Sequence, residues 1–254
     1  YVFTGLVAAE EVAELTAEFD EILDNAPVAK GSTVDRHGRP SRFADYYTLS
    51  DTVPGNASAA VGMVSHPPMM MDSALRVIGH PKIMKIVEGL YGPDFVSFHE
   101  GIFHKAAGNG QPTPWHQDGR THWSAAGDSL EQPDGTGKAH GFNMSVSWSH
   151  CTAENCLWVV PGSHRHWLLA GGGQFPAVSE RLPDAVPMLL DPGDCGMVNR
   201  SSLHGSYPNR SAERRITMVV GFHKRTSAIG AQTVNVHAFK LPDGPTSKKV
   251  KYSE

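Results

Sequence analysis

The run 115–119, Trp-His-Gln-Asp-Gly, places an imidazole and a carboxylate two residues apart. In an extended strand, residues i and i+2 project from the same face. If this run ends a strand, His116 and Asp118 point at one spot. One more histidine would complete the two-histidine, one-carboxylate arrangement that is typical of non-haem Fe(II) sites.

The spacing of His116 and Asp118 is not specific by itself. The chain has 14 histidines and 26 acidic residues among 254, so one or two His-x-acid pairs are expected by chance, and one occurs. On spacing alone, a surface histidine near a solvated carboxylate explains the pair equally well.

A second stretch, 191–217, changes that balance. It begins with the turn sequence Asp-Pro-Gly-Asp and is expected to continue as a strand that ends at His204. A second strand is predicted over 215–222, in which Arg215 and Thr217 share a face. A guanidinium fork beside a hydroxyl is suited to holding a carboxylate. The natural ligand would be a dicarboxylate that chelates iron at one end and meets Arg215 at the other.

Taken together, these motifs resemble the phytanoyl-CoA dioxygenase-like branch of the Fe(II)/2-oxoglutarate oxygenases. The match covers about half the chain, roughly 95–225, in family order. Cys156 departs from the pattern, because many members have Gly there; it suggests a different turn and leaves the ligands untouched. The matching segments are 115–119, 155–164 (Asn-Cys-Leu-Trp-Val-Val-Pro-Gly-Ser-His), the Pro-Gly-Asp turn at 192–194, His204-Gly-Ser and Arg215-x-Thr217.

The resemblance implies Fe(II) held by His116, Asp118 and His204, with 2-oxoglutarate as co-substrate and O2 as oxidant. It also implies that Arg215 and Thr217 hold the distal carboxylate of 2-oxoglutarate. Succinate and CO2 would be released, and hydroxylation of an unactivated C–H bond is the default outcome. Desaturation, epoxidation and ring formation would use the same ligands. In resembling halogenases a small residue replaces the carboxylate ligand, so the presence of Asp118 argues against halogenation.

Further polar residues are candidates for the same site. In resembling proteins a lysine near the place of Lys105 lies near the co-substrate, although a solvated lysine at a strand end is equally expected. Asn143, Ser145 and Ser147 share one face of a predicted strand, which lines a polar pocket or meets water. We assign Lys105 and Asn143 to the co-substrate and Ser147 to the substrate.

Residues just beyond the iron run are candidate substrate contacts, namely Arg120, His122 and Trp123, although 127–137 reads equally as a surface loop. His164 and His166 form a rival His-x-His pair, but no third ligand is evident nearby, so a structural role is favoured. If the strand register slips by one residue, Arg214 replaces Arg215 as the carboxylate anchor.

The helical periodicity precedes the strands. An amphipathic helix is predicted over 8–24, and two helical pieces over 73–91 are separated by Gly79-His-Pro81. Residues 27–72 lack periodicity and are interpreted as a lid loop with aromatic and Met side chains, or as a surface excursion. From residue 94, short strands alternate with Gly/Pro turns.

This order predicts a mainly β fold with helical support, a double-stranded β-helix (jelly-roll, cupin-like) core with N-terminal helices packed on the outside. We expect one domain over 1–254. Residues 1–92 would form the helices and lid loop, 93–225 the jelly-roll catalytic core and 226–254 a C-terminal extension.

Composition excludes several function classes. The net charge is −4 with no basic cluster, which argues against nucleic acid, and no apolar run approaches the ~20 residues of a membrane helix. Three cysteines fit a reducing, cytoplasmic compartment. A small-molecule substrate is expected, and the sequence does not indicate an oligomeric state. Two alternatives remain: a cupin-type metalloenzyme without 2-oxoglutarate, which would not need Arg215-x-Thr217, and a non-catalytic jelly-roll binding module.

Overall fold

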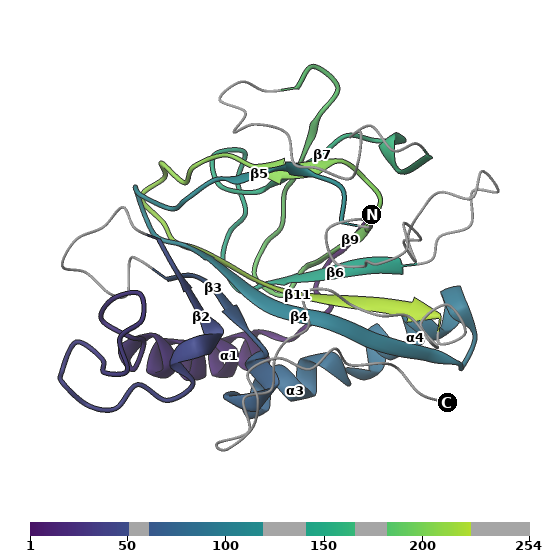
Figure 1. Cartoon of the computed structure of the whole chain (residues 1–254). Coiled ribbons are helices and arrows are strands. Elements are labelled where there is room, and N and C mark those ends of the chain that lie inside the picture. Colours follow the sequence, from purple (N-terminus) through teal and green to yellow (C-terminus); the bar gives the residue numbers. More distant parts are fainter. Residues whose placement is uncertain (51–60, 119–140, 166–181, 225–254) are drawn as a thin grey trace, which may run out of the picture.

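The computed structural model describes residues 1–50, 61–118, 141–165 and 182–224. Two antiparallel sheets face each other, and helices cover the outer face of the larger sheet (Figure 1). This is the mainly β jelly-roll architecture with outer helices that the sequence predicts. The space between the sheets is therefore the place where polar side chains of both can meet.

The larger sheet has seven strands and the smaller one four. Most neighbours in the sheets are far apart in the chain, as closure of a jelly roll requires. The order in the larger sheet is β1 (Val2–Phe3), β9 (Cys195–Asn199), β6 (Gly141–Ser147), β11 (Arg215–Lys224), β4 (Phe95–Lys105), β3 (Val61–Ser65) and β2 (Tyr47–Leu49). The order in the smaller sheet is β5 (Thr113–His116), β10 (His204–Ser206), β7 (Leu157–Val159) and β8 (Val186–Met188).

The long central strand β11 pairs with β4 on one side and β6 on the other. Its alternate residues have opposite roles. Ile216 and Met218 are buried in the apolar core beneath the helices, so Arg215 and Thr217 face the smaller sheet. Thr217 lies opposite Phe103 on β4 and Ser147 on β6. The register therefore determines which side chains reach the space between the sheets.

Three α-helices form where the periodicity predicts them, namely α1 (Ala9–Asp24), α3 (Asp72–Ile78) and α4 (Pro81–Tyr91). The backbone N–H of Ala8 donates to Oε2 of Glu11 at the start of α1, at 2.9 Å. Pro81 occupies the first turn of α4, where its missing N–H costs no hydrogen bond. Short 3-10 turns are η1 (Ala44–Tyr46), η2 (Pro67–Met69) and η3 (Ser163–Arg165).

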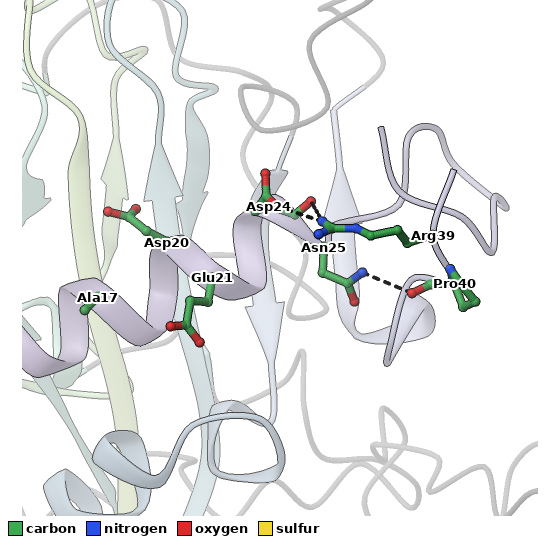
Figure 2. A pocket seen from close by; sticks show the side chains of 7 residues that line it. All are labelled: Ala17, Asp20, Glu21, Asp24, Asn25, Arg39 and Pro40. Carbon is green, nitrogen blue, oxygen red and sulfur yellow. Dashed lines mark hydrogen bonds and ion pairs between the residues drawn. The ribbon is translucent and has the colours of Figure 1, made fainter. Parts of the chain in front are cut away.

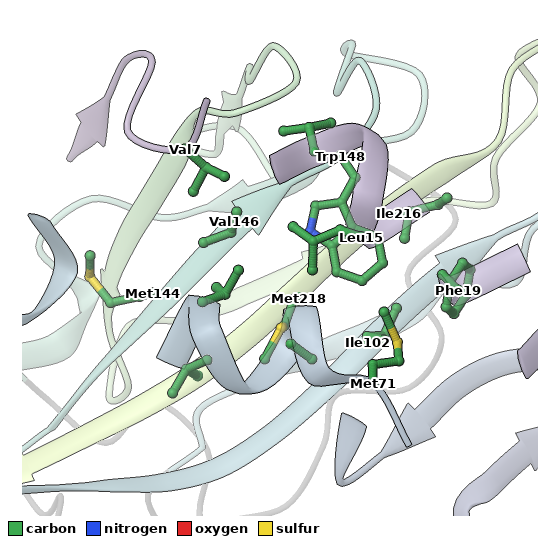
Figure 3. Close-up of a cluster of buried hydrophobic side chains, with 14 of the residues drawn as sticks. Val7, Leu15, Phe19, Met71, Ile102, Met144, Val146, Trp148, Ile216 and Met218 are labelled. Carbon is green, nitrogen blue, oxygen red and sulfur yellow. The ribbon is translucent and has the colours of Figure 1, made fainter. Parts of the chain in front are cut away.

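Apolar side chains of these helices form the main core against the larger sheet (Figure 3). Leu15 and Phe19 of α1 are fully buried. The Phe19 ring meets the Trp148 ring edge to face, with centroids 5.6 Å apart. A separate apolar cluster, which includes Trp115, Trp158 and Leu203, lies at the smaller sheet. The packing of α1 thus supports the face of the larger sheet opposite to the space between the sheets.

Residues 27–72 differ from the expected lid loop. Of their described part, 47–49 and 61–65 form strands β2 and β3, which extend the larger sheet beyond β4. These strands are too short for a period to be visible in the sequence. Met71 is buried in the core beneath the helices and does not close over a substrate surface.

The strand at His204 also differs from the expectation. The sequence predicts a strand that ends at this residue, whereas β9 ends at Asn199 and His204 begins β10. Residues 200–203 form the turn between the two sheets. The chain passes from the larger sheet to the smaller one at this turn, so His204 lies in the smaller sheet, beside β5.

A surface hollow lies at the C-terminal end of α1, and Figure 2 shows the residues that line it. Nη2 of Arg39 donates to Oδ2 of Asp24 at 2.7 Å, and Nδ2 of Asn25 donates to the carbonyl of Pro40 at 3.0 Å. Hydrogen bonds from Arg39, His37 and Arg36 hold the pKa of the Asp24 carboxyl below its usual range. These contacts attach the loop after α1 to the helix end.

No helix in the described part of the chain is long and apolar enough to cross a membrane. The expected C-terminal extension, 226–254, lies outside the described residues. The division into 1–92, 93–225 and 226–254 stays a prediction, with the observation that β1, β2 and β3 contribute strands from before residue 93.

Leu15→Ala should destabilise the protein by about 2–5 kcal/mol, because the truncation leaves a cavity between α1 and the larger sheet. Leu75→Ala on α3 is a matched control: Leu75 is 57% exposed whereas Leu15 is fully buried, so it should change stability by less than about 0.5 kcal/mol. Urea unfolding of both variants measures the difference. Equal losses would show that α1 does not support the sheet.

Candidate metal and co-substrate site

The two predicted histidine ligands are cross-strand neighbours. His116 ends β5, and His204 lies directly opposite it at the start of β10. Directly opposed residues of an antiparallel pair have close Cβ atoms on the same face. Their ring centroids are accordingly 4.2 Å apart. The pairing of β5 and β10 therefore brings together two imidazoles that lie 88 residues apart in the chain.

Backbone carbonyls orient both imidazole rings. Nδ1 of His116 lies 2.7 Å from the carbonyl of Pro114, and Nδ1 of His204 lies 2.8 Å from the carbonyl of Ser202. A carbonyl can only accept, so each Nδ1 carries the hydrogen and each Nε2 keeps its lone pair. This is the arrangement in which a neutral histidine ligates a metal through Nε2.

Asp118 supplies the third donor. Its Oδ1 lies 3.1 Å from Nε2 of His116 and 3.9 Å from Nε2 of His204. One donor atom from each of the three residues lies within 4.8 Å of the others. Ligands at right angles around a divalent metal, with bonds of about 2.1 Å, are about 3 Å apart. These donors fit a single metal ion of the type that takes two imidazoles and one carboxylate.

Burial lowers the pKa of each of the two histidines, and the Asp118 carboxylate raises it. Burial opposes protonation of His116, but the hydrogen bond and charge of Asp118 outweigh it and raise its pKa. Burial and the neighbouring His116 lower the pKa of His204 to about 4. A metal ion needs the free lone pair at Nε2 and the ionised carboxylate, so metal binding would compete with protonation of His116.

Gln117 joins the segments that carry the ligands. Its side chain is buried, and Nε2 donates to the carbonyl of Ser201 at 2.7 Å and to that of Ser163 at 3.3 Å. Oγ of Ser163 in turn accepts from the backbone N–H of Leu203 at 2.7 Å. These bonds attach the turn that contains Asp118 to the turn that precedes His204. Sequence reasoning missed Gln117, because its partners are backbone carbonyls that no motif reveals.

Arg215 faces the space between the sheets and Arg214 faces the helices, as strand parity predicts. Both Arg215 and Thr217 are 5% exposed, and Nη1 of Arg215 donates to Oγ1 of Thr217. Nε of Arg215 donates to the carbonyl of Asn155 at 3.3 Å. Arg214 instead forms an ion pair with Asp20 on α1. The register that would exchange the two arginines is not the one observed.

Lys105 lies directly opposite Arg215 in the pairing of β4 with β11. It is 3% exposed, and Nζ donates to the carbonyl of Tyr207. Burial, and next the charge of Arg215, lower the pKa of Lys105 to about 6. The structure thus brings Lys105, Arg215 and Thr217 into one buried group at the end of β11.

The other predicted residues of the larger sheet occupy different places. Nδ2 of Asn143 donates to Oδ2 of Asp118 at 2.7 Å, next to the metal donors. Ser147 lies opposite Thr217, is fully buried, and donates to the carbonyl of Ser149 at 2.7 Å. Its Oγ is also 3.2 Å from Sγ of Cys151. The assignments of Asn143 to the co-substrate and of Ser147 to the substrate stay predictions.

Arg120, His122 and Trp123 lie outside the described residues, and so does His166. His164 belongs to η3. In the parts of the chain that the structure describes, the one group of three possible metal donors is His116, Asp118 and His204. Cys151, Cys156 and Cys195 are buried free thiols, and burial raises the pKa of Cys156 and of Cys195 to about 12.

Solved structures share this fold. The α-ketoglutarate-dependent epimerase SnoN from nogalamycin biosynthesis superposes with a TM-score of 0.64 at 19% identity, covering 100% of this chain and 90% of that one. EctD from S. alaskensis, solved with 2-oxoglutarate and 5-hydroxyectoine, gives 0.65 at 18% identity, covering 93% and 75%. At these identities the likeness shows the fold, which confirms the jelly-roll prediction.

Sequence comparison gives the family. The dioxygenase andF of Emericella variicolor is 32% identical over 151 residues, which are 58% of this chain and 48% of that protein. The chain spans about half the length of such curated relatives. The phytanoyl-CoA dioxygenase (PhyH) family matches residues 1–217. Iron with 2-oxoglutarate is thus the expected cofactor pair, for which the described residues include suitable donors. The chain belongs to the phytanoyl-CoA dioxygenase family.

Proposed function

We propose that the protein is an Fe(II)- and 2-oxoglutarate-dependent oxygenase that hydroxylates an unactivated C–H bond of a small-molecule metabolite. The observation that carries the proposal is a pair of buried cationic side chains, Lys105 and Arg215, between the same two sheets as the donors His116, Asp118 and His204. The triad accounts for the metal, and the cationic pair accounts for an anionic co-substrate.

Two adjacent buried basic groups do not both stay charged unless an anion joins them, and a pKa of about 6 leaves Lys105 mostly neutral near pH 7 when no anion is bound. Within the described part of the chain, neither Lys105 nor Arg215 forms an ion pair with a carboxylate, and burial is the main cause that lowers both pKa values. Their hydrogen bonds go to Thr217 and to backbone carbonyls. Neutral partners leave the charge of Arg215 uncompensated, and a bound anion would also favour the charged form of Lys105, so this group of residues is suited to receive an anion.

A dicarboxylate fits the distribution of charge along β11. One end of the inner face carries the cationic pair and the hydroxyl of Thr217. Four residues further along β11, Gly221 pairs with Asn143, which contacts Asp118. One carboxylate of 2-oxoglutarate would be held by Arg215, Lys105 and Thr217, and its keto-acid end would lie toward the metal donors. Arg215 can bind that carboxylate with two parallel hydrogen bonds.

The chain contributes positioning and charge. Bound iron, with 2-oxoglutarate and O2, would supply the oxidising chemistry that breaks the C–H bond, with release of succinate and CO2. His116, Asp118 and His204 would hold the ion by three donors and leave the rest of its coordination sphere to the other reactants. The retained Asp118 supports hydroxylation over halogenation.

A small-molecule substrate is supported by the structural relatives. SnoN is described as an enzyme of nogalamycin biosynthesis, and EctD was solved with 5-hydroxyectoine. A cupin-type enzyme without 2-oxoglutarate would use the metal-binding triad but would not need the cationic pair. A non-catalytic binding module would need neither the triad nor the cationic pair.

Lys105 gives the metal-free protein a defined dependence of stability on pH. Its pKa is near 10.5 in the unfolded chain and about 6 in the folded protein. Between these values the unfolded chain binds more protons, so the free energy of unfolding rises with pH. Lys105→Met should lose this contribution of up to about 1.4 kcal/mol per pH unit.

Urea unfolding of the wild type and of Lys105→Met, from about pH 6.5 to about pH 8.5, measures the difference between the two curves. All other titrating groups are common to both proteins and cancel. Parallel curves would show that Lys105 stays charged in the folded protein. Addition of 2-oxoglutarate should stabilise the wild type more than the variant, because the ligand binds only the folded state.

Arg215→Ala should raise the dissociation constant of 2-oxoglutarate by roughly 10- to 100-fold, because a hydrogen bond to a charged group contributes about 1.5–3 kcal/mol. Arg214→Ala is the matched control: its partner is Asp20 on the helix side, so co-substrate binding should hardly change. Isothermal titration of the Mn(II)-loaded proteins compares the two. If Arg214→Ala has the larger effect, the carboxylate does not bind on the inner face.

The proposed activity is tested by anaerobic titration of metal-free protein with Fe(II) and then 2-oxoglutarate. We expect a weak visible charge-transfer band of the chelate that saturates at about one equivalent. Asp118→Ala should lose the band, because it removes a metal donor. Iron binding without a band would favour the cupin-type alternative. No iron binding would favour the binding module. Succinate release then identifies substrates.

A further inference from the structure

We propose that Arg200 is a positioning residue of the metal site, which acts through Asn143 to hold Asp118 as a ligand with one oxygen. No motif in the sequence singles out Arg200. The inference rests on the proposed metal site, because it assigns a purpose to contacts behind one of its three donors.

The two oxygens of Asp118 have different surroundings. Oδ1 faces the histidines, at 3.1 Å from Nε2 of His116 and 3.9 Å from Nε2 of His204. Oδ2 accepts a hydrogen bond of 2.7 Å from Nδ2 of Asn143. A carboxylate held in this way offers one oxygen to a metal ion, because the other is occupied on the side of the larger sheet.

Arg200 fixes the orientation of the Asn143 amide. Nη1 of Arg200 donates to Oδ1 of Asn143 at 3.2 Å. Guanidinium nitrogens donate and do not accept, so the amide must present its oxygen to Arg200 and its NH2 group to Asp118. Without Arg200 the amide could rotate and bring its oxygen against Oδ2, where two acceptors would repel each other. The hydrogen bond to Asp118 therefore depends on Arg200.

The place of Arg200 in the fold makes this contact rigid. Its side chain is fully buried. Its backbone N–H donates to the carbonyl of Gly141 at 3.2 Å, and its own carbonyl accepts from the N–H of Asp118 at 3.0 Å. A Cβ at Gly141 would lie 2.9 Å from Cδ of Arg200, so the glycine leaves room for the arginine stem. The backbone N–H and carbonyl of Arg200 are thus hydrogen-bonded to the start of β6 and to the turn that contains Asp118.

Holding Asp118 to one oxygen has a chemical purpose. A ligand that binds with both oxygens would occupy an additional position that 2-oxoglutarate or O2 needs. Hydrogen bonds around a metal ligand typically change metal affinity by about 10- to 100-fold.

The test measures Co(II) binding to the metal-free full chain without co-substrate. Asn143→Ala and Arg200→Met should each weaken Co(II) binding by about 10- to 100-fold. The visible ligand-field bands of bound Co(II) should shift, because loss of the hydrogen bond from Asn143 changes how the Asp118 carboxylate binds the ion. Ser145→Ala, two residues along the same face of β6, is the control and should change neither quantity.

The double variant distinguishes a relay from two independent structural effects. If Arg200 acts through Asn143, the Co(II) dissociation constant of the double variant should lie within about twofold of that of the single variant that binds Co(II) more weakly. Multiplied losses would overturn the relay. Unchanged affinity and spectrum in Asn143→Ala, which tests the relay even if Arg200→Met fails to fold, would also overturn it. A wild type that binds no Co(II) would instead refute the proposed metal site itself.

Discussion

The antiparallel pairing of β11 with β4 and β6 is the constraint on which the site depends. It places Arg215 opposite Lys105, Thr217 opposite Ser147, and Gly221 opposite Asn143. Side chains alternate between the two faces of a strand. A register shift of one residue would therefore turn the polar side chains of β11 toward the helices and its apolar side chains toward the site. The packing of Ile216 and Met218 beneath the helices makes such a shift unfavourable. The hydrophobic core thus specifies the position of the charged residues.

The smaller sheet lies opposite this face of the larger sheet, and its strands and their adjoining turn carry the metal donors. Its four strands are short, and their pairing alone would leave the turns after β5 and before β10 loosely positioned. Gln117 and Ser163 connect those turns with side-chain hydrogen bonds to backbone groups. The donors are therefore oriented by the protein chain, which lowers the ordering cost of binding a ligand.

Much of this arrangement is predictable from the sequence, for reasons that are local. Helix periods identify α1 and α4, and strand parity separates Arg215 from Arg214. The motif around His116 and Asp118 becomes informative only together with His204. Features that depend on distant partners are not predictable in this way: the strand that begins at His204, the edge strands β2 and β3, and the roles of Gln117 and Arg200 follow from tertiary contacts. The substrate contacts expected at 120–123 stay predictions.

The pairing of β1 with β9 has a consequence for how the molecule forms. Val2 lies opposite Gly196 and Phe3 opposite Cys195, so the first strand can be placed only after nearly two hundred residues have been synthesised. Closing so long a loop is slow, because its entropy is lost before the contacts are gained. After β9 is synthesised and before β1 pairs with it, the edge of β9 is an open template for other strands. During synthesis the protein therefore passes through a stage at which that edge favours association with other chains.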